Sequence, residues 1–410
     1  MSIVAIDIGG TFTDLASLDP ETGRLRFSKS LTTPPNFEQG ALDCLQLASL
    51  SSADIGMLRH GTTVVINALL EHKGARTALL ATAGFRDTLE IGRGNRPEGF
   101  NLFYERLPPV VPRHLRFDVP ERIDAQGKIL TPLDMEALAK IADQLRAERV
   151  EAVGICFMHS WRNPAHEAAA GEFLRKQTSC FVSCSHEISR EFREFERTTT
   201  TALNAYVGPA TARYLERFGT ALHDGGFTGR LFLMGSNGGV LSEEDTALRP
   251  LLLVESGPVG GAAGAAEIGV RSGIKSLVAF DMGGTTAKAV LIENGEAAVS
   301  PLYWVGGYDR GYPIQAAVLD IVEVGAGGGS IASVNDLGSM QVGPRSASSK
   351  PGPACYGLGG QEPTVTDANL YLGRLDGDRF LGGAMRLHRD LAESALGELA
   401  SQLDQPVTAL

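Results

Sequence analysis

Two short segments of the sequence carry residue types that bind phosphate groups. The first is Asp7-Ile-Gly-Gly-Thr-Phe-Thr-Asp14 and the second is Asp281-Met-Gly-Gly-Thr-Thr-Ala-Lys288, so Asp, Gly, Gly and Thr recur in the same order. The backbone N–H groups of a glycine-rich turn form an anion-binding concavity, and threonine hydroxyls add further donors. A carboxylate beside them can hold Mg²⁺ through its waters, because Mg²⁺ loses water reluctantly. The pattern predicts two loops that clamp a triphosphate between them.

Each segment lies between two short apolar runs of the kind that form β-strands. Residues 3–6 and 15–18 flank the first segment, and residues 277–280 and 289–292 flank the second; a turn signal follows each copy. Each copy therefore predicts strand, loop, strand, turn and strand, with Asp7 and Asp281 facing each other across a cleft. A dinucleotide-binding fold or a P-loop would place a helix directly after the loop, so this order argues against both.

The composition is that of an ordinary globular protein with two or three domains. The 410 residues are 43% hydrophobic and 21% charged, and the net charge of −11 argues against a nucleic-acid-binding surface. The 49 glycines gather after apolar runs, where a backbone must approach something closely. Five cysteines, an odd number, do not indicate a disulfide framework. Because the sequence has neither a signal-peptide pattern nor an apolar run of about 20 residues, we expect a cytoplasmic protein.

The rest of the chain alternates between helical and strand patterns, which predicts an α/β fold. Helical spacing covers residues 38–50 and 133–149, and residues 150–158 form an apolar run typical of a buried strand. Asn163 is expected to cap the next helix. A long helix is expected from residue 198, where we place the domain boundary, and a helix of small residues from Ser256.

Some polar residues allow both a functional and a structural interpretation. His60, beside a Gly-Thr-Thr turn, could act as an acid or base, but a lone histidine at a turn is more often a hydrogen-bonded structural residue. Cys180, Cys184 and His186 could bind a metal, but their spacing is poor and no second cysteine pair follows, so core cysteines are favoured. Cys355 has no base near it in the sequence, which favours a structural role.

Taken together, the motifs resemble the hydantoinase/oxoprolinase family, A-type subunit, within the actin-like ATPase superfamily. Besides the two loops, the resemblance rests on motifs spread in order along the chain: Arg59-His-Gly-Thr-Thr63, Ser256-Gly-Pro-Val-Gly-Gly261, Gly325-Ala-Gly-Gly-Gly-Ser330, Pro351-Gly-Pro-Ala-Cys-Tyr-Gly357 and Thr364-Val-Thr-Asp367. It implies an α/β fold of duplicated, ribonuclease H-like lobes, with mixed sheets flanked by helices. The implied domains are an N-terminal domain over residues 1–197 and a hydantoinase A domain over residues 198–410, with the second lobe starting near residue 276.

The resemblance also implies the residues of the site, with ATP and Mg²⁺ as cofactors. Asp7 and Asp281 are expected to be catalytic and to hold Mg²⁺ through waters. The residues expected to contact the nucleotide are Gly9, Gly10, Thr11, Thr13, Asp14, Gly283, Gly284, Thr285, Thr286, Lys288, Gly327 and Gly328.

The activity implied by the resemblance is ATP-dependent hydrolysis of a cyclic amide, such as a hydantoin or 5-oxoproline. Phosphorylation of the amide carbonyl oxygen makes it a good leaving group, and a B-type partner subunit would complete the hydrolysis. A subunit of an ATP-dependent ketone carboxylase, of the acetone or acetophenone type, would use the same loops and stays open as the alternative. A nucleotide-gated scaffold or a sugar-kinase-like regulator is a further alternative, although no aspartate base with a sugar pocket is evident.

The chain differs from the family pattern in two respects. Lys288 stands where family members usually carry Asp, and it either contacts a phosphate or extends to solvent. Strand alternation places Lys288 on the same face as Thr286. Family chains also continue past residue 410 into a glycine-rich segment that closes over the adenosine. We therefore expect the C-terminal part of the second lobe to be missing, through truncation or because a partner supplies it.

Overall fold

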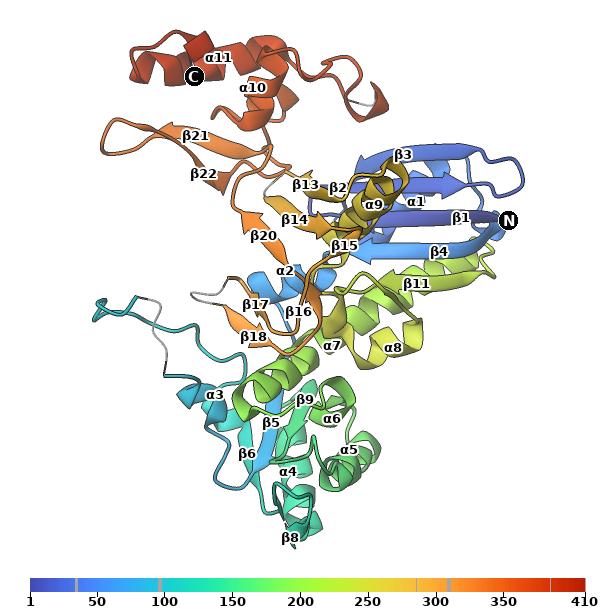
Figure 1. The fold of residues 1–410 in the computed structure, drawn as a ribbon, viewed down its shortest axis with the longest axis vertical. Helices are drawn as coiled ribbons and strands as arrows, with labels where there is room; N and C mark the ends of the chain where they lie inside the picture. The colour runs from blue at the N-terminus through green and yellow to red at the C-terminus, as the bar shows by residue number, and fades with distance from the viewer. Residues whose placement is uncertain (34–35, 95–97, 285, 308–310, 384, 410) are drawn as a thin grey trace.

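The computed structural model describes residues 1–33, 36–94, 98–284, 286–307, 311–383 and 385–409. Its largest sheet has six strands in the order β12-β11-β4-β1-β2-β3 (Figure 1). The central β1 pairs antiparallel with β2 and parallel with β4. The strands are β1 Ser2–Ile8, β2 Phe12–Leu18, β3 Leu25–Leu31, β4 Ile55–Thr62, β11 Arg230–Met234 and β12 Val240–Leu241.

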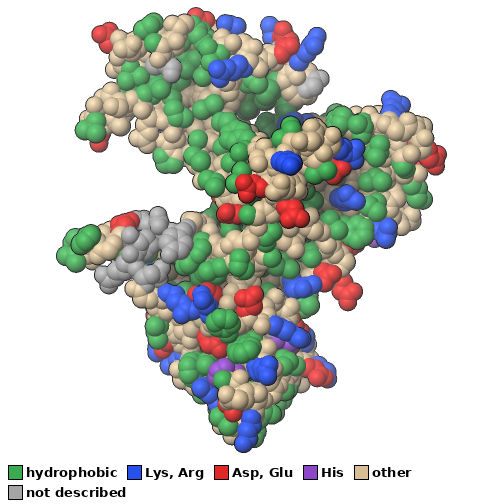
Figure 2. All heavy atoms as spheres, in the orientation of Figure 1, with side chains coloured by type: hydrophobic (Ala, Val, Ile, Leu, Met, Phe, Trp, Pro, Cys, Tyr) green, Lys and Arg blue, Asp and Glu red, His purple; other side chains and the backbone are tan. Residues whose placement is uncertain are grey.

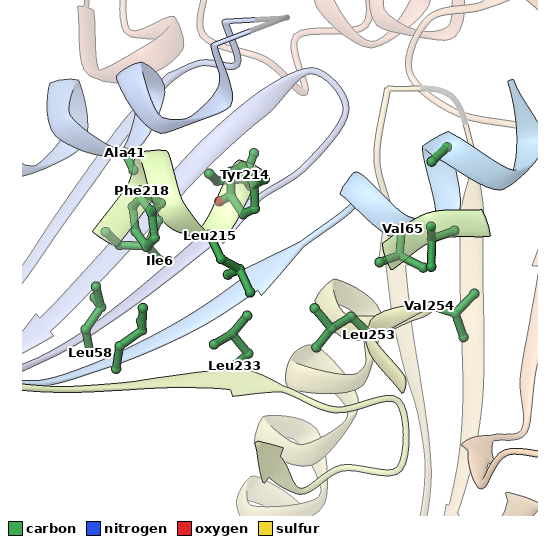
Figure 3. Packing of buried hydrophobic residues seen from close by; sticks show 14 of the residues in the cluster. Ile6, Ala41, Leu58, Val65, Tyr214, Leu215, Phe218, Leu233, Leu253 and Val254 are labelled. Carbon is green, nitrogen blue, oxygen red and sulfur yellow. The ribbon is translucent and has the colours of Figure 1, made fainter. Parts of the chain in front are cut away.

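One face of this sheet forms the largest core of the molecule. Val4, Ile6 and Ile8 alternate with polar or small residues along β1, and all three are buried. Three helices supply the opposing side chains (Figure 3): α1 Phe37–Leu47, α2 Val64–Leu70 and α7 Glu194–Asp224. The predicted helix near residues 38–50 is confirmed. The long α7 begins earlier than predicted, at Glu194, because its first turn holds acidic side chains that suit a helix N-terminus.

A second, parallel sheet stands below the first in Figure 1, in the order β10-β9-β5-β6. The whole of β5 and β9 is buried, as expected of parallel strands covered by helices on both faces. The predicted helix at 133–149 and strand at 150–158 are confirmed as α4 and β9. The elements of this part are β5 Thr77–Thr82, α3 Thr88–Ile91, β6 Arg116–Val119, β7 Arg122–Ile123, β8 Ile129–Thr131, α4 Met135–Ala147, β9 Ala152–Cys156, α5 Ala165–Gln177, β10 Phe181–Cys184 and α6 Ser185–Ile188.

The predicted cap of α5 was wrong by one residue. The helix begins at Ala165, and Pro164 occupies the N-cap position. Asn163 still serves the first turn, because its Oδ1 accepts a hydrogen bond from the Ala165 N–H at 3.1 Å. Proline provides the fixed φ that starts a helix but no capping side chain, so the asparagine acts from one position earlier.

A buried ion pair ties the start of α7 to the second sheet. The Arg197 guanidinium lies 3.6 Å from the Glu167 carboxylate, and both side chains are almost fully buried. The same guanidinium donates to the Phe157 carbonyl oxygen at 2.7 Å and to the hydroxyls of Ser160 and Ser185. Glu167 in turn accepts from the Phe157 N–H at 2.8 Å. This network satisfies two charges that would be costly to bury alone.

The second lobe follows the small-residue helix α9 Ser256–Ser272, which starts where predicted. Its sheet consists of β13 Ser276–Met282, β14 Ala287–Glu293, β15 Glu296–Ala297 and β20 Ile321–Val324. β14 pairs antiparallel with β13 on one side and with β20 on the other. α8 Glu243–Leu248 contacts α7 and β11, and the hairpin of β17 Tyr303–Val305 and β18 Tyr312–Ile314 packs beside α2 and α7. β16 Val299–Ser300 and β19 Val318–Leu319 pair with each other.

The C-terminal elements form a separate small cluster at the top of Figure 1. They are β21 Ser330–Val334, β22 Met340–Ser346, α10 Val365–Tyr371 and α11 Arg389–Gln402. The predicted domain boundary at residue 197 falls inside α7, whose side chains join the cores of both sheets.

The cysteines lie in the core rather than in a metal site. All five are free thiols; four are buried and Cys180 is half-buried. Within the described residues, no group of three or more His, Cys, Asp or Glu side chains could hold a metal ion. No helix in the described part of the chain has the length and hydropathy needed to cross a membrane.

Candidate phosphate-binding site

The two glycine-rich loops form the same turn, and each connects two antiparallel strands as predicted. The Gly9 N–H donates to the Phe12 carbonyl oxygen at 2.9 Å, and the Gly283 N–H donates to the Thr286 carbonyl oxygen at 3.0 Å. Asp7 stands at the end of β1 and Asp281 near the end of β13. The repeat in the sequence is therefore a repeat in backbone geometry.

The loops of the two lobes touch. A Cβ placed on Gly284 would lie 2.9 Å from the Thr11 hydroxyl oxygen, so only glycine allows this approach. Gly10 has open space where a side chain would stand. Among the described residues, the amides of Gly10, Thr11 and Gly284 donate to no protein acceptor. They form a group of free donors between the lobes, which suits an anionic ligand.

The Asp7 carboxylate lies close to the charges of both loops. Atoms packed around it displace water and raise its pKa from 3.8 to about 6, although one side of the residue stays open to solvent. The negative charges of Asp14 and Asp281 raise the pKa further, whereas Lys29 lowers it. A divalent cation at this position would relieve the same repulsion.

Two glycines from different elements approach the Asp7 carboxylate. A Cβ on Gly61, in β4, would lie 2.4 Å from Asp7 Oδ1, and one on Gly257, in the first turn of α9, would lie 3.0 Å from it. The Ser256 hydroxyl accepts a hydrogen bond from the Thr62 N–H at 2.9 Å, which joins β4 to the start of α9. The motifs at 59–63 and 256–261 therefore meet at Asp7.

If the loops bind ATP as the sequence predicts, Gly61→Ala should lower ATP turnover at least tenfold without a matching loss of stability. The new methyl group overlaps Asp7 Oδ1, the end of a movable side chain, so the carboxylate is displaced while the backbone stays in place. Gly264→Ala in α9 is the matched control, because a Cβ there meets no atom within 4 Å. ATPase rates and melting temperatures of both variants in the complete enzyme test this; equal ATPase rates would contradict it.

The ligand-free protein should become more stable when Asp7 is replaced by Asn. A carboxyl group whose pKa is raised on folding destabilises the native state once it ionises, so the penalty is absent below pH 3.8 and complete above about pH 6. After allowance for solvent screening, we expect a gain of about 1 kcal/mol at pH 8 that shrinks towards pH 4. Urea unfolding of both proteins across this range is the measurement; a pH-independent difference would refute it.

The second loop rests on residues from the C-terminal motifs. The Gly328 and Gly329 N–H groups donate to the Gly283 and Gly284 carbonyl oxygens at 2.9 and 2.6 Å. The Thr366 N–H and hydroxyl both donate to the Gly328 carbonyl oxygen at 2.8 Å. Hydrogen bonds thus join Thr366 to Gly328, and Gly328 and Gly329 to the second loop, although these segments are far apart in the sequence.

Buried Asp367 explains why the motifs at 351–357 and 364–367 occur together. Its carboxylate accepts hydrogen bonds from the Cys355 N–H at 2.7 Å and from the Thr364 N–H at 2.8 Å. Sequence reasoning missed this role, although Thr-x-x-Asp before a helix is a capping-box signal, and that box is present at α10.

The structure brings most of the predicted site residues together, but not all side chains face the loops. Asp7, Gly9, Gly10, Thr11, Asp281, Gly283, Gly284 and Thr286 lie on the two loops or at the strand ends that carry them. Thr285 falls outside the described residues. Thr13 is buried on the face of β2 opposite to the Asp14 side chain, and its hydroxyl lies 3.3 Å from that of Thr32. The Gly328 amide donates to the Gly283 carbonyl oxygen and so supports the second loop, whereas the Gly327 amide donates to Ser330 Oγ within its own turn.

Each loop has a pair of opposite charges beside it, and the acidic and basic positions of the pair are exchanged between the two lobes. In the first lobe Asp14 pairs with Lys29 on the neighbouring strand at 2.7 Å. In the second lobe Lys288 takes the place of Asp14, and Glu323 takes the place of Lys29, 3.8 Å from the lysine Nζ.

Lys288 also has a closer partner. Its Nζ donates to the buried Glu255 carboxylate at 2.6 Å, and the Tyr303 hydroxyl donates to the other oxygen of that carboxylate at 2.8 Å. Burial, the negative charge of Glu255 and its hydrogen bond raise the pKa of Tyr303. Sequence reasoning did not identify Glu255, which stands immediately before α9.

His60 is a structural residue. It is fully buried, and burial lowers its pKa to about 4, so the imidazole is neutral. Its Nδ1 lies 3.1 Å from the Ile6 carbonyl oxygen, which can only accept, so Nδ1 carries the proton. The Tyr214 hydroxyl then donates to Nε2 at 2.5 Å. The histidine holds β1, β4 and α7 together beneath the first loop.

Comparison with known families agrees with this geometry along nearly the whole chain. A family model described as Hydantoinase/oxoprolinase matches residues 197–410, and one described as Hydantoinase/oxoprolinase N-terminal region matches residues 3–178. The chain belongs to the hydantoinase/oxoprolinase family.

Two relatives in this family are named subunits of larger enzymes. The caprolactamase subunit alpha of Pseudomonas jessenii is 37% identical over 98% of this chain and 58% of its own length. The acetophenone carboxylase gamma subunit of Aromatoleum aromaticum is 34% identical over 97% of this chain and 57% of its own length. This chain therefore spans less than two thirds of the length of either relative.

Solved structures of the family share the fold. The ATP-dependent caprolactamase from Pseudomonas jessenii has a TM-score of 0.81 at 36% identity, and nucleotide-free acetone carboxylase has a TM-score of 0.81 at 27% identity. Each match covers 99% of this chain and 60% of the solved chain. The predicted α/β fold with mixed sheets flanked by helices is confirmed.

The residues of the two loops and of the strand ends beside them have the chemistry needed to bind a nucleotide phosphate and Mg²⁺. The free amides of Gly10, Thr11 and Gly284 supply donors without a competing side chain. Mg²⁺ usually binds proteins through one or two carboxylates, keeping several waters, and Asp7 and Asp281 provide two that repel each other. Such an ion would offset charge on the phosphoryl group.

Proposed function

We propose that this chain carries the phosphoryl-transfer site of an ATP-dependent enzyme that hydrolyses a cyclic amide of the hydantoin or 5-oxoproline type. The observation that carries the proposal is the meeting of two matching glycine-rich turns beside Asp7 and Asp281, with amides from both lobes that donate to no acceptor among the described residues. The family to which the chain belongs supports it, as does its likeness to a caprolactamase that is ATP-dependent.

The chemistry assigns the loops a binding and orienting role. An unstrained amide resists attack by water, so its carbonyl oxygen first attacks the γ-phosphorus of ATP and ADP leaves. Water then adds to the activated amide carbon, and the tetrahedral intermediate expels the ring nitrogen as an amine, which opens the ring and leaves an acyl phosphate. A second water attacks the acyl carbon, and phosphate departs with the former carbonyl oxygen. The amides of Gly10, Thr11 and Gly284 would hold the phosphates in line, and Asp7 and Asp281 would hold Mg²⁺ through its waters.

The proposal includes a partner and a place in the cell. Because related chains are named as subunits, we propose that a B-type partner subunit completes the hydrolysis. ATP is held in the cytoplasm, so we propose a cytoplasmic enzyme.

The second candidate is the subunit of an ATP-dependent ketone carboxylase. It is favoured by the likeness to the acetophenone carboxylase gamma subunit and to acetone carboxylase. Both candidates need the same phosphate loops, so the loops cannot distinguish them.

Isotope transfer separates the two candidates. The complete enzyme is supplied with ATP, Mg²⁺ and a lactam carrying ¹⁸O in its carbonyl group, and the phosphate released is analysed by mass spectrometry. We expect one ¹⁸O atom in that phosphate. If ATP is consumed only with a ketone and bicarbonate, the chain belongs to a carboxylase.

We propose that Lys288 exchanges Glu255 for a nucleotide phosphate when ATP binds. Lysine is an effective point-charge partner for phosphate, and a hydrogen bond to a charged group contributes about 1.5–3 kcal/mol. Lys288→Met should therefore raise the Kd for ATP about tenfold or more in the complete enzyme. Glu255→Gln, which keeps the lysine but weakens the pair that it must leave, is the counterpart and should lower the Kd rather than raise it. Unchanged ATP affinity in Lys288→Met would reject the contact.

A further inference from the structure

Both candidate reactions need a base beside the carbonyl group that is phosphorylated. When the carbonyl oxygen attacks the γ-phosphorus, the neighbouring atom gives up a proton: the ring nitrogen of a lactam, or the α-carbon of a ketone. Without that loss the product is a cation, which is harder to form. A carboxylate positioned within hydrogen-bond reach of the proton is one of the groups that enzymes use for such a step.

Glu255 is a buried carboxylate beside the candidate phosphate site. Its side chain is 1% exposed, and it stands immediately before α9. Two residues further on, a Cβ on Gly257 would lie 3.0 Å from Asp7 Oδ1, so the first turn of α9 reaches the Asp7 carboxylate. On its other side Glu255 contacts Lys288, which pairs with Asp281 across the strands β13 and β14. Glu255 therefore has neighbours in both lobes of the site.

The other carboxylates near the loops are less suited to take a proton from a substrate. Asp7 and Asp281 are the pair proposed to hold the waters of Mg²⁺. Asp14 and Glu323 are 52% and 41% exposed, so bulk water competes for their oxygens. Glu255 combines burial with a place next to the loops and has no proposed role toward the metal ion.

The two partners of Glu255 hold it in different ways. The Tyr303 hydroxyl donates to Oε1 at 2.8 Å, and Lys288 Nζ donates to Oε2 at 2.6 Å. If Lys288 moves to a phosphate when ATP binds, Oε2 loses its partner while Tyr303 still orients the carboxylate. A buried carboxylate oxygen without a partner is costly, so it favours a new donor. An N–H group of the substrate is such a donor.

The oxygen that Lys288 would leave lies toward the accessible side of this pair. The lysine side chain is 13% exposed, compared with 1% for Glu255. In Figure 2 the molecule is hollowed between the C-terminal cluster at the top and the parts below it, and β17 and β20 lie near the inner end of this hollow in the same view of Figure 1. These strands carry Tyr303 and Glu323, the neighbours of the pair. A small substrate would approach from this hollow.

We propose that Glu255 is the base that accepts the proton from the atom beside the substrate carbonyl, an inference that rests on the proposed function. With a lactam, the N–H bond breaks and its electron pair forms a C=N bond. The C=O π pair forms the new O–P bond, and ADP leaves with the electron pair of its bond to the γ-phosphorus. Glu255 returns the proton to the ring nitrogen when that atom leaves as an amine. With a ketone, the same carboxylate takes the α-carbon proton and an enol phosphate forms.

Binding of a cyclic amidine tests the contact without turnover. Iminopiperidine is a cation with the ring shape of a lactam, and its N–H groups pair with a carboxylate. In the complete enzyme with Mg²⁺ and a non-hydrolysable ATP analogue, Glu255→Gln should raise the Kd of iminopiperidine at least tenfold. Glu323→Gln removes an equal charge beside the same lysine and is the matched control, with an expected change below about threefold. Equal Kd values for the wild type and Glu255→Gln, or no binding to the wild type, would overturn the proposal.

Single-turnover cleavage of ATP with saturating substrate tests the chemical step. Glu255→Gln should lower the rate by about 10²-fold or more without raising the Kd for ATP, and Glu255→Asp, which keeps a carboxylate, should recover part of the rate. A Glu255→Gln rate within about threefold of the wild-type rate, or an equal loss in both variants, would overturn the assignment. Failure of the proposed function would look different, because the wild type itself would then cleave no ATP in response to a lactam or a ketone.

Discussion

Replacement of Asp7 by alanine is expected to lower ATP turnover of the complete enzyme by about 10²-fold or more. Its carboxylate stands at the end of β1, where the charge of Asp281 and the glycine backbones of Gly61 and Gly257 converge. If Asp7 anchors the magnesium waters, its loss leaves the charge on the transferred phosphoryl group poorly offset, and the barrier rises by several kcal/mol.

The measurement is the steady-state ATPase rate at saturating Mg²⁺, together with the melting temperature. Asp143→Ala is the matched control, because this aspartate lies on the exposed face of α4, where it pairs with Arg146. It should keep full activity. An Asp7→Ala enzyme with near-normal ATPase activity would remove Asp7 from the site.

Replacement of Arg197 by methionine is expected to destabilise the protein by about 3–5 kcal/mol. The substitution removes the buried guanidinium that lies beside the Glu167 and Glu194 carboxylates, and losing the cation of a buried ion pair costs more than the pair itself contributes. Arg271→Met, which removes an exposed pair with Glu267 on α9, is the control and should change the free energy of unfolding by less than about 1 kcal/mol.

Urea unfolding of both variants provides the comparison. If Arg197→Met does not fold, the double variant Arg197→Met, Glu167→Gln keeps the test open, because neutralising the glutamate should restore part of the stability. A loss below about 1 kcal/mol in Arg197→Met would show that the pair is dispensable.

Local pattern was enough to predict the loops, since everything that defines them lies within a dozen residues. The alternation of apolar residues gives the strands, and the glycines between them allow only a tight turn. The repeat itself then predicts that Asp7 and Asp281 occupy equivalent positions, as they do in β1 and β13.

Strand alternation also limits which neighbours can share a face, and this bears on two of the residues predicted to contact the nucleotide. Thr13 and Asp14 are adjacent in β2, so their side chains point to opposite faces. The structure places Thr13 under α1 and Asp14 on the other face, beside Lys29. A contact of both side chains with one phosphate is therefore difficult to build.

Contacts between distant segments could not be predicted from one sequence. Nothing in the sequence around Lys288 indicates that its partner is Glu255, the residue immediately before α9. Nor does Gly61 reveal that its missing side chain makes room for Asp7. Such relations depend on how the layers pack, and that packing is fixed by the whole core.

The central claim is that ATP binds between the two turns, and a structure of the complete enzyme with Mg²⁺ and a non-hydrolysable ATP analogue tests it most directly. The account predicts that the β- and γ-phosphates lie within hydrogen-bond distance of the Gly10, Thr11 and Gly284 amides, with waters joining Mg²⁺ to Asp7 and Asp281. Phosphates bound elsewhere, with these amides still free, would contradict it.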